Sequence, residues 1–228
     1  MSIDITSLIR PNIRSMKKYA SARDEFSGKA KVFLDANENS FGSPAKHQLN
    51  RYPDPLQKQL RDKISRYKGL SSPDRLFLGN GSDEAIDLIL RAFCEPREDA
   101  MMLLPPSYGM YSVTAHVNDV TILEVPLNSD FSLNTDEIIK VAKERAPKVI
   151  FICSPNNPSA NVYDEKDVDK VLKNVNSLVI VDEAYVDFAD TPSWVERLDE
   201  FNNLIVIQTF SKAWGMAGAR LGMAFADP

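Results

Sequence analysis

The sequence predicts an α/β protein of three layers, in which helices cover both faces of a mainly parallel sheet. Short apolar runs rich in β-branched residues recur along the chain, as buried strands do. Stretches with the three- and four-residue apolar spacing of helices separate these runs, at intervals that suit crossover connections between parallel strands. No internal repeat or low-complexity tract interrupts the alternation in the 228 residues.

The composition narrows the classes of partner. With 43% hydrophobic and 26% charged residues, the chain has the balance of an ordinary globular protein. Its formal net charge of −5 offers no basic field for nucleic acid or an anionic membrane. We therefore expect small-molecule substrates and a second copy of the same chain as partners.

The cellular location and the metal content are predicted from the lengths of the apolar runs and from the positions of the cysteines and histidines. No apolar run approaches the ~18 residues of a membrane span, and residues 1–10 lack the apolar core of a signal peptide. Cys94 and Cys153 lack CxxC spacing and are expected to be buried thiols of a reducing compartment. Because His47 and His116 stand far apart, no metal site is expected. These features predict a cytoplasmic protein.

The first 40 residues or so are expected to form an extended arm, with a short strand-like run at residues 31–35. Residues 35–39 gather amides and carboxylates, which favours a plain Asx-rich turn. A second turn at residues 51–55 precedes an expected surface helix from Leu56 to Tyr67. In the second turn Tyr52 is either a packing residue or a phenol that reaches a phosphate across a subunit boundary.

The next unit is a strand at residues 75–78, a glycine turn at residues 79–84, and a helix from Ala85 to Cys94. The start of such a helix offers free N–H groups and the positive end of its dipole to a phosphate. Ser82 and Asp83 lie at this point and could instead serve only as N-caps.

A strand at residues 100–104 leads into a proline-stiffened turn that carries Tyr108. Its ring could lie flat on an aromatic ligand, and a core position is equally favoured. A further strand is expected at residues 120–125 and a helix at residues 135–146. The strand at residues 149–153 is followed by a turn with two prolines that presents amide side chains, Asn157 among them, before a helix that starts near Asp164.

The most apolar run, residues 178–181, ends in Asp182-Glu183-Ala184-Tyr185. A carboxylate at the end of a buried strand needs a partner, because desolvation favours its neutral form. A protonated pyridine nitrogen would be such a partner. The alternative for Asp182 is a helix or turn cap.

The last expected strand, residues 204–207, is followed by a loop that contains hydrogen-bond donors for a phosphate group and one lysine amine. Hydroxyls at Thr209 and Ser211 can donate to a phosphate, and Arg220 can clamp it with two N–H groups. Lys212 is then placed to form a Schiff base with the aldehyde of the anchored cofactor. Taken alone, Lys212 would be read as a solvated loop lysine.

These segments resemble the pyridoxal-phosphate-dependent enzymes of the aspartate-aminotransferase-like superfamily, and within it the histidinol-phosphate aminotransferase family. The resemblance rests on motifs along the whole chain: Asn37-Glu38-Asn39, Arg51-Tyr52-Pro53, Gly81-Ser82-Asp83-Glu84, residues 105–111, Ser154-Pro155-Asn156-Asn157-Pro158, Asp182-Glu183-Ala184-Tyr185, and Thr209 to Arg220. It implies a fold-type I large domain over residues 46–228, and an arm over residues 1–45 that contributes to a small domain and a dimer contact.

The resemblance also implies a role for each site residue. Lys212 would bind pyridoxal 5'-phosphate covalently and move the substrate proton, and Asp182 would keep the pyridine nitrogen protonated. Asn157 and Tyr185 would hydrogen-bond the phenolic oxygen, and Tyr108 would stack on the ring. The remaining roles are phosphate binding by Ser82, Asp83, Thr209, Ser211 and Arg220, phosphate binding by Tyr52 from the other subunit of a homodimer, and substrate contact by Asn37.

The implied reaction converts L-histidinol phosphate and 2-oxoglutarate into imidazole acetol phosphate and L-glutamate, a step of histidine biosynthesis. An aromatic aminotransferase, a threonine-phosphate decarboxylase-like enzyme and a truncated, non-catalytic cofactor-binding fragment stay open as alternatives. Two departures from the family pattern bear on them. Ala160 stands where the family's Asn-Pro-Thr-Gly turn has its glycine, and the sequence ends at Pro228 whereas relatives continue into a small domain.

Overall fold

The computed structural model describes residues 3–17, 28, 31–32, 34–45, 47 and 49–228. Within them, seven strands form one sheet in the order β1-β7-β6-β5-β4-β2-β3. The pairs among β2, β3, β4, β5 and β6 are parallel, whereas β7 runs antiparallel to both β1 and β6. The strands are β1 (Leu76–Asn80), β2 (Ala100–Leu103), β3 (Thr121–Glu124), β4 (Val149–Cys153), β5 (Leu178–Asp182), β6 (Leu204–Thr209) and β7 (Leu221–Phe225).

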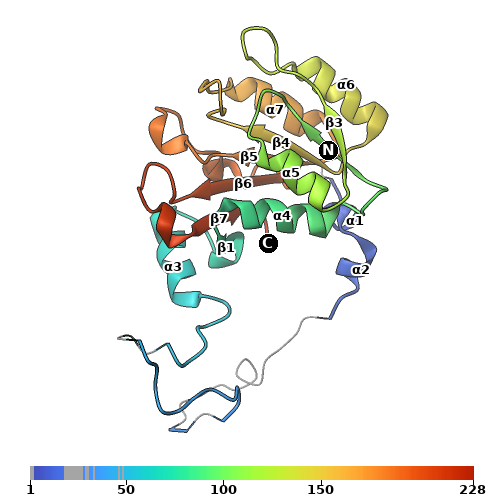
Figure 1. Cartoon of the computed structure of the whole chain (residues 1–228). Coiled ribbons are helices and arrows are strands. Elements are labelled where there is room, and N and C mark those ends of the chain that lie inside the picture. The colour runs from blue at the N-terminus through green and yellow to red at the C-terminus, as the bar shows by residue number, and fades with distance from the viewer. Residues whose placement is uncertain (1–2, 18–27, 29–30, 33, 46, 48) are drawn as a thin grey trace.

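Helices lie on both sides of this sheet (Figure 1). The α-helices are α1 (Ile5–Leu8), α2 (Pro11–Arg14), α3 (Lys58–Tyr67), α4 (Ser82–Phe93), α5 (Met110–Val117), α6 (Thr135–Arg145) and α7 (Glu165–Asn174). The 3-10 turns are η1 (Pro73–Arg75), η2 (Val186–Phe188), η3 (Trp194–Arg197) and η4 (Ala217–Ala219).

The central strands are apolar throughout because both of their faces are covered. In β5, Val179 and Val181 pack into one core cluster with α6 and α7. Leu178 and Ile180 point the other way and pack into a second cluster with α4 and α5. Alternation of side chains between the two faces of a strand produces this division. The predicted three-layer α/β architecture with a mainly parallel sheet is confirmed.

Several predicted boundaries move for identifiable reasons. The surface helix begins at Lys58 rather than Leu56, because Asp54 accepts hydrogen bonds from the backbone N–H groups of both residues, at 2.9 and 3.0 Å, and so holds a turn there. The helix before Cys94 begins at Ser82, with Gly81 as its N-cap, so the reading of Ser82 or Asp83 as N-caps is wrong. Asp164 is the N-cap of α7, as predicted.

Four of the α-helices and strands were not predicted from the sequence. The short helices α1 and α2 lie in the segment expected to be an extended arm, so that expectation is wrong there: Leu8 packs into the core cluster of α4 and α5, and Arg10 forms an ion pair with Glu95 at 3.0 Å. The other two are α5 and the antiparallel strand β7, which contains Gly222. A Cβ on Gly222 would lie 2.1 Å from the carbonyl carbon of Gly81, so the two chains approach too closely for any other residue. The close approach brings β7 against the start of α4.

The strand-like run predicted at residues 31–35 is wrong for its described residues. Lys31, Val32, Leu34 and Asp35 belong to no helix or strand, and Phe33 lies outside the described residues. Val32 is 70% exposed and Leu34 is 86% exposed, so these apolar side chains have no sheet to pack on. In Figure 1 this part of the arm lies below the body of the protein.

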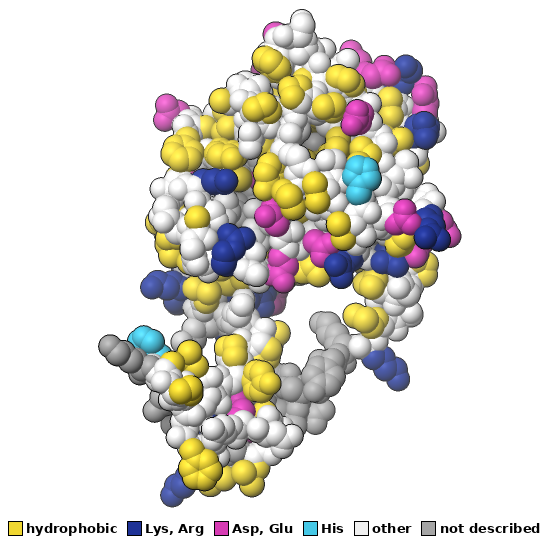
Figure 2. Space-filling model, viewed as in Figure 1, with side chains coloured by type: hydrophobic (Ala, Val, Ile, Leu, Met, Phe, Trp, Pro, Cys, Tyr) yellow, Lys and Arg dark blue, Asp and Glu magenta, His cyan; other side chains and the backbone are white. Residues whose placement is uncertain are grey.

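The structure also bears on the expectations drawn from composition, which concern surface charge and the two cysteines. Dark blue and magenta side chains are interspersed over the face of the body shown in Figure 2, without a large basic area. Cys94 and Cys153 are free and buried, as predicted, and burial raises the pKa of each thiol to about 12. Among the described residues, no helix is long and apolar enough to cross a membrane.

Candidate active site

The predicted site residues other than those of the arm gather at one edge of the sheet. Asp182 and Thr209 end the parallel strands β5 and β6, and Asn157 follows β4. Ser82 opens α4, which follows β1. The carboxyl ends of parallel strands meet at one edge, and this edge is where open α/β sheets bind ligands.

Asp182 is the most buried of these residues, with 2% of its surface exposed. Its Oδ2 accepts a hydrogen bond of 2.6 Å from the Tyr111 hydroxyl, and its Oδ1 accepts one of 3.0 Å from the Ala184 N–H. Burial raises the pKa of Asp182, while the two hydrogen bonds and the charge of Lys212 act in the opposite direction. The second bond is a local turn contact, so Asp182 also has the capping role that was its alternative.

Tyr111 is a site residue for which the sequence suggested no role. It is fully buried, its ring stacks on Phe151 at 4.6 Å, and its edge meets Tyr108 at 5.5 Å between ring centroids. These contacts fix the direction in which its hydroxyl points, which is toward Asp182. Its only sequence signal is its place one helical turn after Tyr108.

Asn157, Tyr185 and Lys212 form a second group of contacts. The Asn157 amide donates to the Tyr185 hydroxyl at 3.3 Å, and the Nζ atom of Lys212 lies 5.4 Å from the centre of the Tyr185 ring. Lys212 is exposed, as its solvated alternative requires, yet its amine lies over an aromatic face of the site. The charge of Lys212 also acts on Asp182, which places the two groups in one electrostatic cluster.

Hydroxyl, guanidinium and backbone donors form a cradle beside this group. The Thr209 hydroxyl donates to Ser211 Oγ at 3.0 Å. The Arg220 guanidinium lies against Gly81, where a Cβ would come within 2.4 Å of its Nη2 atom. Gly81 has a φ of +83°, and its N–H donates to the Arg220 carbonyl at 3.0 Å. The first N–H groups of α4 have no acceptor within the helix, so the cradle suits an anion.

Tyr108 and Asp83 face each other across the same edge. The Tyr108 hydroxyl donates to Asp83 Oδ1 at 3.3 Å. Burial, Asp83 and the nearby groups Asp182 and Tyr185 raise the pKa of Tyr108 to about 12. Tyr108 is half-buried, so one part of its ring packs on the core and the other part is open to the site.

Two predicted site residues are not brought to this edge. Asn37, in the arm, and Tyr52, in the turn region before α3, are both exposed. Their segments are joined to each other, since Glu38 accepts from the Tyr52 N–H at 2.6 Å and forms an ion pair with Arg51 at 2.8 Å. The arm thus holds the two turns together, away from the sheet edge.

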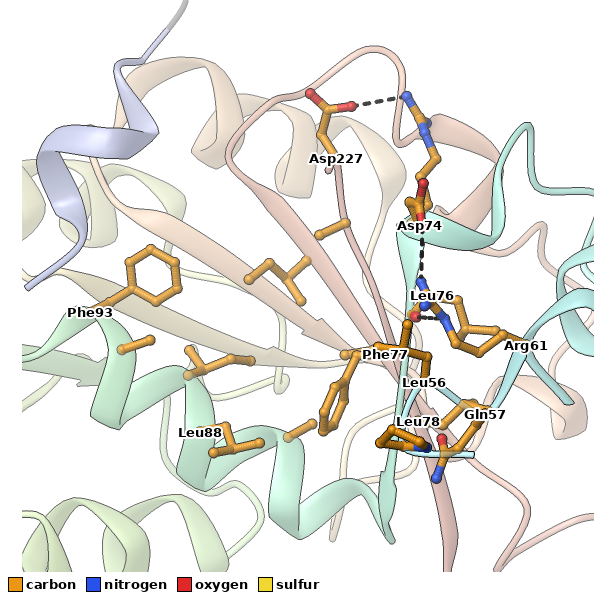
Figure 3. Close-up of a pocket in the computed structure, with 18 residues that line it drawn as sticks. Leu56, Gln57, Arg61, Asp74, Leu76, Phe77, Leu78, Leu88, Phe93 and Asp227 are labelled. Carbon is orange, nitrogen blue, oxygen red and sulfur yellow. Dashed lines mark hydrogen bonds and ion pairs between the residues drawn. The ribbon is translucent and has the colours of Figure 1, made fainter. Parts of the chain in front are cut away.

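Two hollows differ in their relation to the site. One, of about 430 Å³, borders the predicted residues and is lined by Asn157, Ala160, Tyr185 and Phe188 among others. The larger, of about 530 Å³, lies between α4 and β1 (Figure 3). Its lining includes Leu88, Phe93 and Phe77 but none of the predicted site residues. Among the described residues, no group of three or more His, Cys, Asp and Glu side chains could hold a metal ion.

The comparisons with known proteins agree on the family. The model of the family "Aminotransferase class I and II" matches residues 24–228. The histidinol-phosphate aminotransferase of Cytophaga hutchinsonii is 51% identical over 227 residues, which are 100% of this chain and 65% of the relative. That of Parabacteroides distasonis is 54% identical over 225 residues, covering 99% of this chain and 64% of the relative. The chain therefore spans just under two thirds of the length of these relatives.

Solved structures give the same result. The histidinol-phosphate aminotransferase of Sinorhizobium meliloti, in complex with pyridoxal-5'-phosphate, matches with a TM-score of 0.72 and 25% identity, covering 84% of this chain and 55% of that chain. That of Clostridium acetobutylicum matches with a TM-score of 0.69 and 26% identity, covering 78% and 52%. By sequence and by structure, the chain belongs to the aminotransferase class I and II family.

Proposed function

We propose that this chain is the greater part of a pyridoxal-phosphate-dependent aminotransferase that acts on L-histidinol phosphate and 2-oxoglutarate. The products would be imidazole acetol phosphate and L-glutamate. The observation that carries the proposal is the buried Asp182 carboxylate, held at a strand end within the electrostatic reach of the Lys212 amine. The names of relatives more than 50% identical support this substrate over the alternatives.

The residues present fit pyridoxal 5'-phosphate on their own chemistry. Asp182 is a buried carboxylate that a pyridinium N–H would neutralise, which offsets the cost of its desolvation. The paired Asn157 and Tyr185 offer hydrogen bonds to a phenolic oxygen. The cradle of Ser82, Thr209, Ser211 and Arg220 suits a phosphate. Tyr108, with Asp83 holding its hydroxyl, would cover the ring.

When bound there, the cofactor supplies an electron sink for the carbon from which the substrate proton is removed. Lys212 would act as the general base and acid, holding the proton at Nζ between its removal from one carbon and its delivery to another. The exposed stem of Lys212 gives the amine room to move over the Tyr185 ring. Asp182 would keep the pyridine nitrogen protonated, with Tyr111 fixing the carboxylate in place.

The arm and the turn that carries Tyr52 are proposed to complete the site in a cytoplasmic homodimer. Residues 1–45 would form the arm and residues 46–228 the cofactor-binding domain. Tyr52 is 70% exposed, so its hydroxyl is available to a phosphate held by the partner subunit. Asn37 lies in the turn joined to the Tyr52 segment and would line the substrate pocket.

The experiment that tests this function compares three amino donors with the same purified chain and cofactor: L-histidinol phosphate, L-phenylalanine and O-phospho-L-threonine. Formation of glutamate from 2-oxoglutarate is measured for each. The proposal predicts the largest kcat/KM for L-histidinol phosphate. A preference for phenylalanine would indicate an aromatic aminotransferase instead, and release of carbon dioxide from O-phosphothreonine would indicate a decarboxylase-like enzyme. Cofactor binding without turnover of any donor would indicate a non-catalytic fragment.

A further inference from the structure

A second buried carboxylate, Glu183, follows Asp182 and takes no part in the proposed chemistry. It is 2% exposed and its side chain lies on the face of the sheet opposite to that of Asp182, as alternation along a strand requires. Asp182 meets Tyr111 of one core cluster, whereas Glu183 meets the segment of Trp194, which belongs to the other cluster.

Glu183 accepts hydrogen bonds from three segments of the chain. The Ser193 hydroxyl donates to Oε2 at 2.5 Å, and the Gln208 amide donates to the same oxygen at 2.7 Å. The Trp194 N–H donates to Oε1 at 2.7 Å. The Gln208 amide also donates to Ser193 Oγ at 3.0 Å, which closes the network. Burial raises the pKa of Glu183, while the bonds from Ser193, the Trp194 N–H and Gln208 act in the opposite direction, because each donates to the carboxylate.

The hydrogen-bond network of Glu183 connects the ends of the neighbouring strands β5 and β6. The parallel pairing of β5 with β6 ends at Asp182 opposite Ile207, and the Glu183 N–H then donates to the Ile207 carbonyl at 2.7 Å. The bond from Gln208 to Glu183 extends this connection by one residue. After this bond, one segment continues to Tyr185 and the other to Thr209 and Lys212.

We propose that Glu183 is a positioning residue for the cofactor: its bond to Gln208 fixes the spacing between Asp182 and the Lys212 segment. The inference rests on the proposed function, in which one rigid cofactor contacts both segments. A cofactor ring tolerates little change in that spacing, since displacements of about 1 Å in a site cost on the order of a hundredfold in rate.

The test measures the dissociation constant of pyridoxal phosphate by absorbance titration for the wild-type chain and for Gln208→Met. The thioether has about the size of the glutamine side chain but no N–H group, so it cannot donate to Glu183. Glu183 keeps its bonds from the Ser193 hydroxyl and the Trp194 N–H, and only the link between β5 and β6 is lost. We expect the dissociation constant to rise about tenfold.

Two further variants separate positioning from stability. Val168→Ala, in the buried face of α7, lowers stability away from the site and should leave the dissociation constant within about twofold of wild type. The double substitution Glu183→Gln with Gln208→Glu exchanges acceptor and donor between the two strands and should restore most of the affinity. If Gln208→Met yields no folded protein, Gln208→Leu removes the same link from β6 and should show the same loss of affinity.

The outcomes distinguish this inference from the function on which it rests. A wild-type chain that folds but binds no pyridoxal phosphate overturns both. A wild-type chain that binds, with Gln208→Met binding equally well, overturns only the positioning role. A loss of affinity in Val168→Ala equal to that of Gln208→Met, at matched urea midpoints, would reduce the Glu183–Gln208 link to a general contribution to stability.

Discussion

The predicted site residue Asp182 at the strand edge is buried and hydrogen-bonded, whereas Asn37 and Tyr52, in the amino-terminal part of the chain, are exposed. At the edge, Asp182 is 2% exposed and its carboxylate oxygens are both hydrogen-bonded. In the segment between the arm helices and α3, Tyr52 is 70% exposed and Phe41 is 101% exposed (Figure 2 shows hydrophobic side chains gathered on this part). The edge is organised by the core of the chain, whereas this segment displays apolar side chains outward.

The difference indicates which parts of the site a single chain builds alone. The edge residues are positioned by strands whose pairing fixes them, so their contacts follow from the sheet. The arm joins its own turns through Glu38, and this local order brings neither Asn37 nor Tyr52 to the edge. Under the proposed function, the arm residues act in a site completed by a second subunit.

The largest expected effect comes from the edge. Lys212→Ala should lower the rate of glutamate formation by at least about a thousandfold, because under the proposed function the Lys212 amine over the Tyr185 ring holds the substrate proton. Non-covalent binding of the cofactor should persist through the phosphate cradle. Lys140→Ala, which removes an exposed lysine of α6, serves as the control. A wild-type rate in Lys212→Ala would remove this residue from its proposed role.

Asp182→Asn should lower the same rate by about a hundredfold while the cofactor still binds. The amide has nearly the size of the carboxylate but cannot stabilise a protonated pyridine nitrogen, and loss of one such electrostatic contact has roughly this cost. Single-turnover kinetics with L-histidinol phosphate measure the effect. An unchanged rate constant would contradict the pairing of Asp182 with the pyridine nitrogen.

For the exposed turn before α3, Tyr52→Phe should raise the dissociation constant of pyridoxal phosphate by about tenfold, the value of one hydrogen bond to a charged group. The effect should appear only at protein concentrations at which the chain is dimeric by sedimentation velocity. Tyr67→Phe, a similarly exposed tyrosine of α3, provides the matched control. A loss of affinity that persists in the monomer would place Tyr52 in its own subunit's site.

The buried Asp182 also predicts a pH dependence of stability without cofactor. Its folded-state pKa is raised by burial, so its contribution to the free energy of unfolding is largest below about pH 4 and falls as the pH rises through the folded value. Asp182→Asn lacks this titration. The free energy of unfolding of Asp182→Asn minus that of wild type should therefore increase from about pH 4 to about pH 7. The increase should be about 1.4 kcal/mol for each pH unit that separates the folded pKa from the unfolded pKa. A constant or decreasing difference in urea denaturation would oppose this.

The smallest effect concerns the turn beside the site. Ala160 has a φ of +61°, the left-handed conformation that glycine adopts more readily. Ala160→Gly should therefore raise the free energy of unfolding by up to about 1 kcal/mol. Ala146→Gly, at a φ of +47° in the C-cap of α6, provides a matched substitution remote from the edge. Destabilisation by Ala160→Gly alone would mean that the methyl group packs usefully.

The sequence predicts the strand edge better than the arm, because buried strands require runs of apolar residues that can be recognised in the sequence. Apolar runs mark the strands, and a carboxylate at the end of such a run, as at Asp182, indicates a site. The contacts of Tyr111 and Glu183 depend on which distant segments meet, and no local pattern contains that information. Strand β7 was not predicted because it contains Gly222, a residue type that is rare in strands. Glycine is required there because the backbone of Gly81 lies too close for a side chain, and this contact exists only in the folded chain. The described part of residues 31–35 has strand composition but no strand with which to pair.

The cofactor site at this strand edge is tested most directly by borohydride reduction of the purified chain with pyridoxal phosphate, followed by peptide mapping. We expect one reduced pyridoxyl group, attached to Lys212, after an absorption band in the visible range has formed. A folded chain that shows no such band, or that carries the label on another lysine, would contradict the assignment of this strand edge as the cofactor site.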